Sequence, residues 1–145
     1  MKRVAGKEAR FRKAENHRIS KAIVKHAKDT SRGIGVEDLK GLRERFPVWA
    51  KDARNRLSGW SFRQLVDFLT YKAALVGVPL VKVNPAYTSQ TCSACGHCRR
   101  ENRKSQAKFL CVSCGMGMNA DQNAALNIRA RALSKRALEL AGLTV

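Results

Sequence analysis

Apolar residues recur at helical spacing in three segments of the chain. A first helix is expected from about Lys7 to Lys28, with an apolar face formed by Phe11, Ile19, Ala22, Ile23 and Ala27. From Trp60 to Val76, apolar residues repeat at i, i+3, i+4 and i+7, and Gly77 ends the pattern. A third helix is expected over 121–140. The hydrophobic pattern therefore predicts three helices joined by irregular segments.

Two short apolar runs between these helices have the length of strands. They cover 33–37 and 78–83, and a basic, irregular connection containing Pro47 and Trp49 follows the first of them. A strand, a connection with a helix, and a second strand make a βαβ unit, in which the two strands are parallel and the crossover is right-handed. The sequence therefore predicts an α/β protein.

Four of the five cysteines occur in two identical C-x2-C-G motifs. Cys92 and Cys95 precede Gly96, and Cys111 and Cys114 precede Gly115. This spacing is typical of a structural zinc site with four thiolate ligands, in which each glycine allows the positive φ of a tight turn. Four scattered buried cysteines, or two disulfides, are the alternatives. Cys98 makes a competing C-x2-C pair with Cys95 but lacks the following glycine, so we predict that it is a spare thiol.

The two motifs lie in a segment that we call the ribbon (residues 87–117). It falls between the second strand and the last helix, so we expect an insertion within one domain formed by 1–86 and 118–145.

The charge of the chain is far from balanced. It holds 29 Lys and Arg against 11 Asp and Glu, for a net charge of +18. Such a surplus opposes compaction unless a polyanion neutralises it, and nucleic acid is the usual polyanion. An anionic membrane surface is the rival, but no apolar run approaches the ~20 residues of a spanning helix. Cysteines at metal spacing suit a reducing cytosol, so we expect a cytoplasmic, nucleoid-associated protein.

Two basic regions are candidates for phosphate contacts. One is the first helix, from Lys2 to Lys28, for which a solvated face remains the alternative. The other is in the ribbon and consists of Arg99, Arg100, Arg103, Lys104 and Lys108. Neither looks like a sequence-reading helix, so we expect contacts to phosphates rather than to base edges.

Two carboxylates differ in their setting from the other acids. Glu37 ends the first strand, and Asp121 begins the last helix on its apolar side, so it is expected to point inward. Acids that meet at the carboxyl edge of a parallel sheet could hold Mg²⁺, which prefers oxygen ligands. The alternatives are that Asp121 only complements the helix dipole, and that Asp38 faces inward instead of Glu37.

Several motifs occur in the order found in a known family. They are VEDL at 36–39, FLTYKA at 68–73, YTSQTCSACG at 87–96, FLCVSCG at 109–115 and DQNAALNI at 121–128. The chain resembles the TnpB (OrfB) family of insertion-sequence proteins, which resemble type V CRISPR effectors and act as RNA-guided DNA endonucleases. The resemblance implies a RuvC domain with an RNase H-like fold, in which three carboxylates bind two Mg²⁺ ions. Glu37 matches the second carboxylate and Asp121 the third.

The chain departs from the family pattern in two places. Asn119 and Ala120 stand where the family usually has Asp-Arg, which would weaken nucleic-acid or helix-start contacts. The first catalytic aspartate has no counterpart, because no Asp-x-Gly strand precedes the first helix. The resemblance therefore implies a partial RuvC fold, the C-terminal half of such a nuclease, whose missing strands a separate N-terminal fragment would supply.

The missing aspartate affects the expected function. Two carboxylates cannot clamp the two ions of a two-metal site. We therefore expect a chain that binds DNA or guide RNA but is not a complete transposon endonuclease alone. The alternative is a stand-alone zinc-ribbon nucleic-acid-binding protein without a nuclease role.

Overall fold

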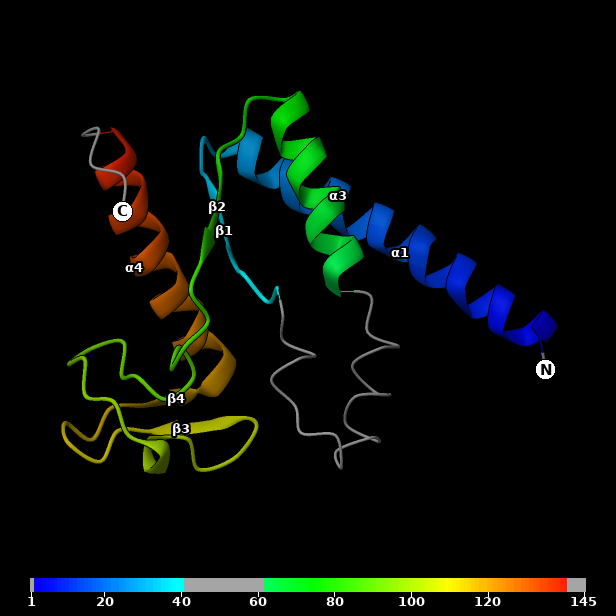
Figure 1. Ribbon diagram of the computed structural model, residues 1–145. Coiled ribbons are helices and arrows are strands. Elements are labelled where there is room, and N and C mark those ends of the chain that lie inside the picture. The colour runs from blue at the N-terminus through cyan, green and yellow to red at the C-terminus, as the bar shows by residue number, and fades with distance from the viewer. Residues whose placement is uncertain (1, 41–61, 141–145) are drawn as a thin grey trace. The chain divides into compact units, whose positions relative to one another are not determined.

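The structure is a computed structural model that describes residues 2–40 and 62–140. The basic connection expected after Lys40 lies almost entirely outside the described residues. Those residues form three α-helices and two small sheets (Figure 1). Within the described ranges, no helix is long and apolar enough to cross a membrane. The chain divides into two compact units, one of Met1–Ile34 and Leu39–Leu80, the other of Gly35–Asp38 and Val81–Val145.

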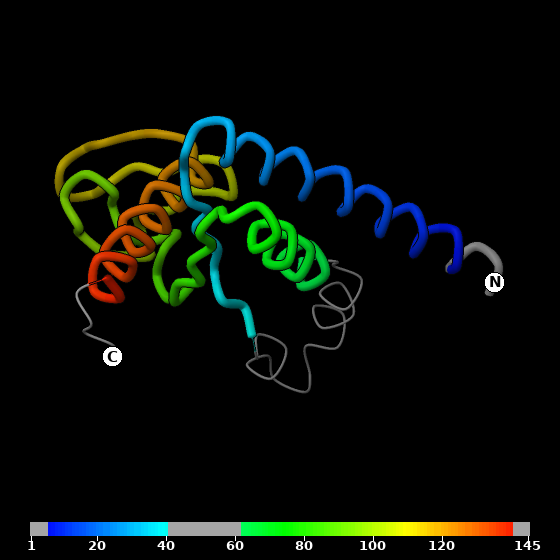
Figure 2. Tube along the Cα trace, turned by 90° about the horizontal axis from the view of Figure 1, so that it is seen from above, coloured from blue at the N-terminus to red at the C-terminus, as the bar shows by residue number. Residues whose placement is uncertain are grey.

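The first unit is a helix pair. Helix α1 (Lys2–Asp29) and helix α3 (Phe62–Leu75) lie side by side in both views (Figures 1 and 2). The expected apolar stripe of α3 is confirmed at its centre, since Val66, Leu69 and Ala73 are buried.

The expected apolar face of α1 is confirmed at Ala27 but wrong at Phe11, Ala22 and Ile23, which are exposed. Phe11 is 71% exposed, and the buried residues are Asn16, Ser20, Val24 and Ala27. The buried face is half polar because α3 offers partners to its polar groups. Asn16 Nδ2 donates to Gln64 Oε1 at 3.1 Å. Lys72 Nζ donates to Ser20 Oγ and to the His17 carbonyl, both at 2.7 Å. Partial burial, together with Lys21, lowers the pKa of Lys72.

Strands β1 (Ile34–Glu37) and β2 (Leu80–Val83) pair in a two-stranded sheet. The Ile34 N–H donates to the Pro79 carbonyl, and the Asp38 N–H donates to the Val83 carbonyl, both at 2.8 Å. From the first bond to the second, the donor and the acceptor both move toward the C-terminus along their strands, as in a parallel pair. The expectation of a buried first strand is wrong, because β1 is only partly covered and Gly35 is exposed.

The second unit contains helix α4 (Ala120–Leu140) and two antiparallel strands, β3 (Lys108–Leu110) in the ribbon and β4 (Gly117–Asn119), which begins at the last residue of the ribbon. Figure 1 shows these strands at the N-terminal end of α4. Farther along, α4 lies so close to β1 that a Cβ at Gly35 would be 3.0 Å from the Ala132 Cβ. Gly35 therefore permits the close approach of strand and helix.

Candidate metal centre and carboxylate cavity

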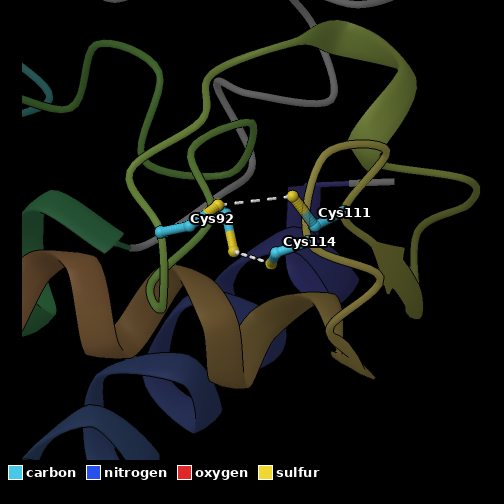
Figure 3. Close-up of side chains that lie close together, drawn as sticks. Cys92, Cys111 and Cys114 are labelled. Carbon is cyan, nitrogen blue, oxygen red and sulfur yellow. Dashed lines mark hydrogen bonds between the residues drawn. The ribbon is translucent and has the colours of Figure 1, made fainter.

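The four cysteines of the two motifs converge at one end of the ribbon. Their Sγ atoms all lie within 4.8 Å of one another. Cys92 and Cys114 are 3.7 Å apart, and Cys95 and Cys111 are 3.6 Å apart, as the dashed lines in Figure 3 mark. A tetrahedral shell with Zn–S bonds of ~2.3 Å would separate its sulfurs by about 3.8 Å. The cluster therefore fits a metal ion such as zinc.

The two cysteine turns have the same backbone geometry. In the first, the Gly96 N–H donates to the Cys92 carbonyl at 2.9 Å, and in the second the Gly115 N–H donates to the Cys111 carbonyl at 3.0 Å. The φ angles of the two glycines are +75° and +73°. These values confirm the positive φ that the sequence predicts at both glycines. Glycine adopts such a φ without steric cost, which allows each tight turn to form. Cys98 is exposed and is not part of the cluster.

Hydrogen bonding separates the acidities of two of these thiols. The backbone N–H of Cys114, with that of Ser113, lowers the pKa of Cys111 to about 6. The backbone N–H of His97 acts to lower the pKa of Cys95, but the hydrogen bond with Cys114, burial, and the hydrogen bonds with Cys111 and Cys92 together raise it to about 12. Metal ions bind thiolates, so metal binding must displace the proton that Cys95 holds.

A buried asparagine that the sequence analysis did not single out joins the two cysteine turns. Asn102, in the 3-10 helix η1 (Arg100–Asn102), is 0% exposed. Its Nδ2 donates to the carbonyls of Gln90 and His97, at 2.9 and 3.0 Å, beside the first turn. Its Oδ1 accepts the Val112 N–H of the second turn at 3.0 Å. Every polar atom of the side chain is therefore used to hold the two turns together.

Two asparagines of α4 attach the helix to the segment around Cys92, from Thr88 to Ser93. Asn123 Nδ2 donates to the Thr91 carbonyl at 2.7 Å, and Asn123 Oδ1 accepts the Ser93 N–H at 3.0 Å. Asn127 Nδ2 donates to the carbonyls of Thr88 and Thr91, at 2.9 and 2.7 Å. The DQNAALNI motif therefore contains two residues with structural roles, which its hydrophobic pattern gave no reason to expect.

The two candidate carboxylates, Glu37 and Asp121, line one cavity of about 370 Å³ in the second unit. Thr88 Oγ1 donates to Glu37 Oε1 at 2.6 Å. The expectation that Asp121 points inward is wrong, because its side chain is 80% exposed. The face of α4 that is buried against the ribbon carries Ala120, Asn123 and Asn127 instead. Asp121 therefore offers its oxygens to the cavity from the surface.

Arg103 differs from the other basic residues of the ribbon. It lines the cavity, and its Nη2 lies 3.8 Å from Asp121 Oδ1. Its guanidinium also donates to the carbonyls of Ser105 and Gln106, at 3.4 and 3.2 Å. The remaining four candidates for nucleic-acid contacts are all exposed, namely Arg99, Arg100, Lys104 and Lys108. The structure therefore places one ribbon cation at the carboxylates and leaves four at the surface.

The Asn119-Ala120 departure does not weaken the start of the helix. Asn119 Oδ1 accepts the N–H groups of Asp121 and Gln122, at 2.9 and 3.3 Å, as an N-cap does. Asparagine and aspartate cap helices about equally well. Ala120 is fully buried beneath the cysteines, in a small core with Cys92, Phe109 and Cys111.

Fold and site together define an α/β protein in which a four-cysteine ribbon adjoins a cavity lined by two carboxylates. Residues 62–128 match the family model described as Cas12f1-like, TNB domain. The chain is 42% identical to the CRISPR-associated endodeoxyribonuclease Cas12f1 of Sulfoacidibacillus thermotolerans, over 84% of this chain and 28% of that protein. It is 33% identical to a TnpB-like protein of Methanocaldococcus jannaschii, over 88% of this chain and 45% of that protein.

Solved structures agree with these similarities. The cryo-EM structure of a Cas12f1–sgRNA–target DNA complex matches with a TM-score of 0.65 and 31% identity, over 86% of this chain and 35% of that chain. This chain belongs to the TnpB/OrfB family. It spans less than half the length of these relatives.

Proposed function

We propose that this chain is the C-terminal, zinc-bearing part of a RuvC-like, RNA-guided DNA endonuclease of transposon origin. The observation that carries the proposal is the cavity that Glu37 of β1 and Asp121 of α4 line together, beside a four-cysteine ribbon, in a chain of this family. On this proposal, 1–86 and 118–145 form half of an RNase H-like domain, and 87–117 is its inserted ribbon. Guide RNA and target DNA are the partners, by analogy with the relatives.

The three charged groups of the cavity and the four cysteines each have a chemical role in this proposal. Glu37 and Asp121 offer the carboxylate oxygens that Mg²⁺ prefers. When bound, Mg²⁺ activates water and stabilises the leaving oxygen of a phosphodiester. Arg103 holds a positive charge at the same cavity, where it can attract and orient a DNA phosphate. Zinc, held by Cys92, Cys95, Cys111 and Cys114, supplies folding energy to a ribbon with little apolar core.

On this proposal the described residues do not form a complete catalytic site by themselves. Among the described residues, only the four cysteines bring three or more potential ligands of a metal ion together. A two-metal nuclease needs a further carboxylate to hold its second ion. We infer that a further carboxylate from outside the described residues completes the site.

Cation binding and DNA cleavage test this proposal together. Mn²⁺, titrated into the purified chain and followed by electron paramagnetic resonance, should bind at about one equivalent. Glu37→Ala and Asp121→Ala should each weaken this binding, whereas Glu101→Ala, at an exposed site on η1, should not. With Mg²⁺ or Mn²⁺, single- and double-stranded DNA should remain uncut.

Two results would contradict parts of the proposal. Cleavage that disappears in both carboxylate variants would show that two carboxylates suffice. Absence of Mn²⁺ binding would remove the nuclease role. It would favour a stand-alone zinc-ribbon nucleic-acid-binding protein, because only the nuclease proposal requires Glu37 and Asp121 to act together.

The exposed cations predict how binding to nucleic acid depends on salt. Affinity for DNA should fall log-linearly with salt concentration, with little preference among unrelated sequences. Replacing Arg100, Lys104 and Lys108 by alanine should reduce the slope by about 0.9 for each phosphate that is no longer neutralised. Fluorescence anisotropy of labelled DNA at several salt concentrations measures this dependence of affinity on salt. Arg129→Ala, on α4, is the control. A sequence preference that survives at high salt would contradict binding through phosphates alone.

A further inference from the structure

Thr88 has no role in the proposed function, yet it is the residue that contacts Glu37. It lies between β2 and Cys92 and is 4% exposed. Its single hydroxyl hydrogen has two possible acceptors, Glu37 Oε1 at 2.6 Å and the Pro85 carbonyl at 3.1 Å. The carboxylate is closer, and a hydrogen bond to a charged acceptor is about twice as strong as a neutral one. The hydroxyl therefore donates mainly to Glu37.

Thr88 is also bonded to the helix that carries the second carboxylate. Its carbonyl accepts Asn127 Nδ2 from α4 at 2.9 Å, and Asn127 is itself buried. Asp121 lies in the first turn of the same helix. The side chain of Thr88 thus contacts one carboxylate, and its backbone contacts the element that bears the other.

We propose that Thr88 is a positioning residue for the carboxylate cavity, with its hydroxyl orienting Glu37 and its carbonyl fixing α4. An unrestrained glutamate samples several rotamers, most of which direct its oxygens elsewhere. A bond to Oε1 limits this freedom and leaves Oε2 available to a cation. Groups that hydrogen-bond a metal-ligating side chain typically change metal affinity by about 10–100-fold.

Two substitutions at position 88 separate the hydroxyl from the shape of the side chain. Thr88→Val keeps the volume and removes the donor, whereas Thr88→Ser keeps the donor. In the full chain, Thr88→Val should raise the dissociation constant for Mn²⁺ by about tenfold, and Thr88→Ser should change it little. Thr91→Val is the matched control, because the Thr91 hydroxyl donates to the Tyr87 carbonyl and not to a carboxylate.

A second readout needs no cation at the cavity. In protein with metal at the cysteines only, the side-chain carboxyl ¹³C resonance of Glu37 should shift in Thr88→Val and not in Thr88→Ser or Thr91→Val. This readout depends only on the contact between Thr88 and Glu37, whereas the Mn²⁺ titration rests on the proposed function. Absence of Mn²⁺ binding in every variant and in the parent chain would overturn the proposed function alone.

Three outcomes would overturn the role of Thr88. The first is an unchanged Glu37 resonance in Thr88→Val. The second is an equal reduction of Mn²⁺ affinity in Thr88→Val and Thr91→Val. The third is loss of the metal at the cysteines in Thr88→Val, which elemental analysis would detect and which would show that the residue only supports the fold.

Discussion

Replacing Cys111 by serine is expected to abolish metal binding by the ribbon, whereas Cys98→Ser should leave about one zinc ion per chain. Cys111 is 2% exposed and belongs to the small core with Cys92, Phe109 and Ala120, so its replacement removes both a ligand and buried packing. Structural zinc contributes roughly 10–16 kcal/mol to the folding of zinc-finger peptides. The ribbon of Cys111→Ser should therefore be unfolded.

Elemental analysis of the purified variants gives the metal content, and amide hydrogen exchange over residues 87–119 reports whether the ribbon is folded. Cys98→Ser is the matched control, because it makes the same chemical change at an exposed cysteine outside the cluster. Full zinc content in Cys111→Ser, or its loss in Cys98→Ser, would contradict the assignment of the four ligands.

Asn102→Ala is expected to destabilise the ribbon by about 3 kcal/mol or more. The substitution removes three hydrogen bonds and leaves the Val112 N–H and the carbonyls of Gln90 and His97 without this partner. The Val112 N–H is left unsatisfied, which costs about 1–3 kcal/mol, and each lost bond to a carbonyl costs about 0.5–1.5 kcal/mol, because the His97 and Gln90 carbonyls still accept the N–H groups of Cys92 and Arg99. Because Asn102 joins the two cysteine turns, zinc affinity should fall as well.

Unfolding by heat and competition with a chelator for the zinc both measure this effect. Glu101→Ala is the control, since Glu101 is the neighbouring, exposed residue of η1 and a surface substitution usually changes stability by less than about 0.5 kcal/mol. Equal zinc affinity in Asn102→Ala and Glu101→Ala would show that the bonds of Asn102 do not hold the turns together.

Local patterns determined much of this protein from sequence alone. The spacing of the cysteines and the two glycines is sufficient for the metal cluster, because each turn closes through bonds between residues that are close in sequence. The same reason made other local features predictable. They are the apolar stripe of α3, the positions of β1 and β2, and the bounds of α4 to within a residue. The positive net charge, which does not depend on the fold, indicated that nucleic acid is the binding partner.

The tertiary structure alone decided which polar residues are buried and what they hold. Hydrophobic periodicity assigns polar residues to solvent, yet Asn16, Ser20, Asn102, Asn123 and Asn127 are all buried. The burial of each is offset by a partner distant in sequence or by a backbone carbonyl that only the fold brings close, as that of Asn127 is by Thr88. For the same reason the sequence placed Asp121 on the inward face of α4. Farther along the helix this face does pack on β1, where Ile128 and Ala132 lie against Gly35, but in the first turn the Asp121 carboxylate is exposed at the cavity.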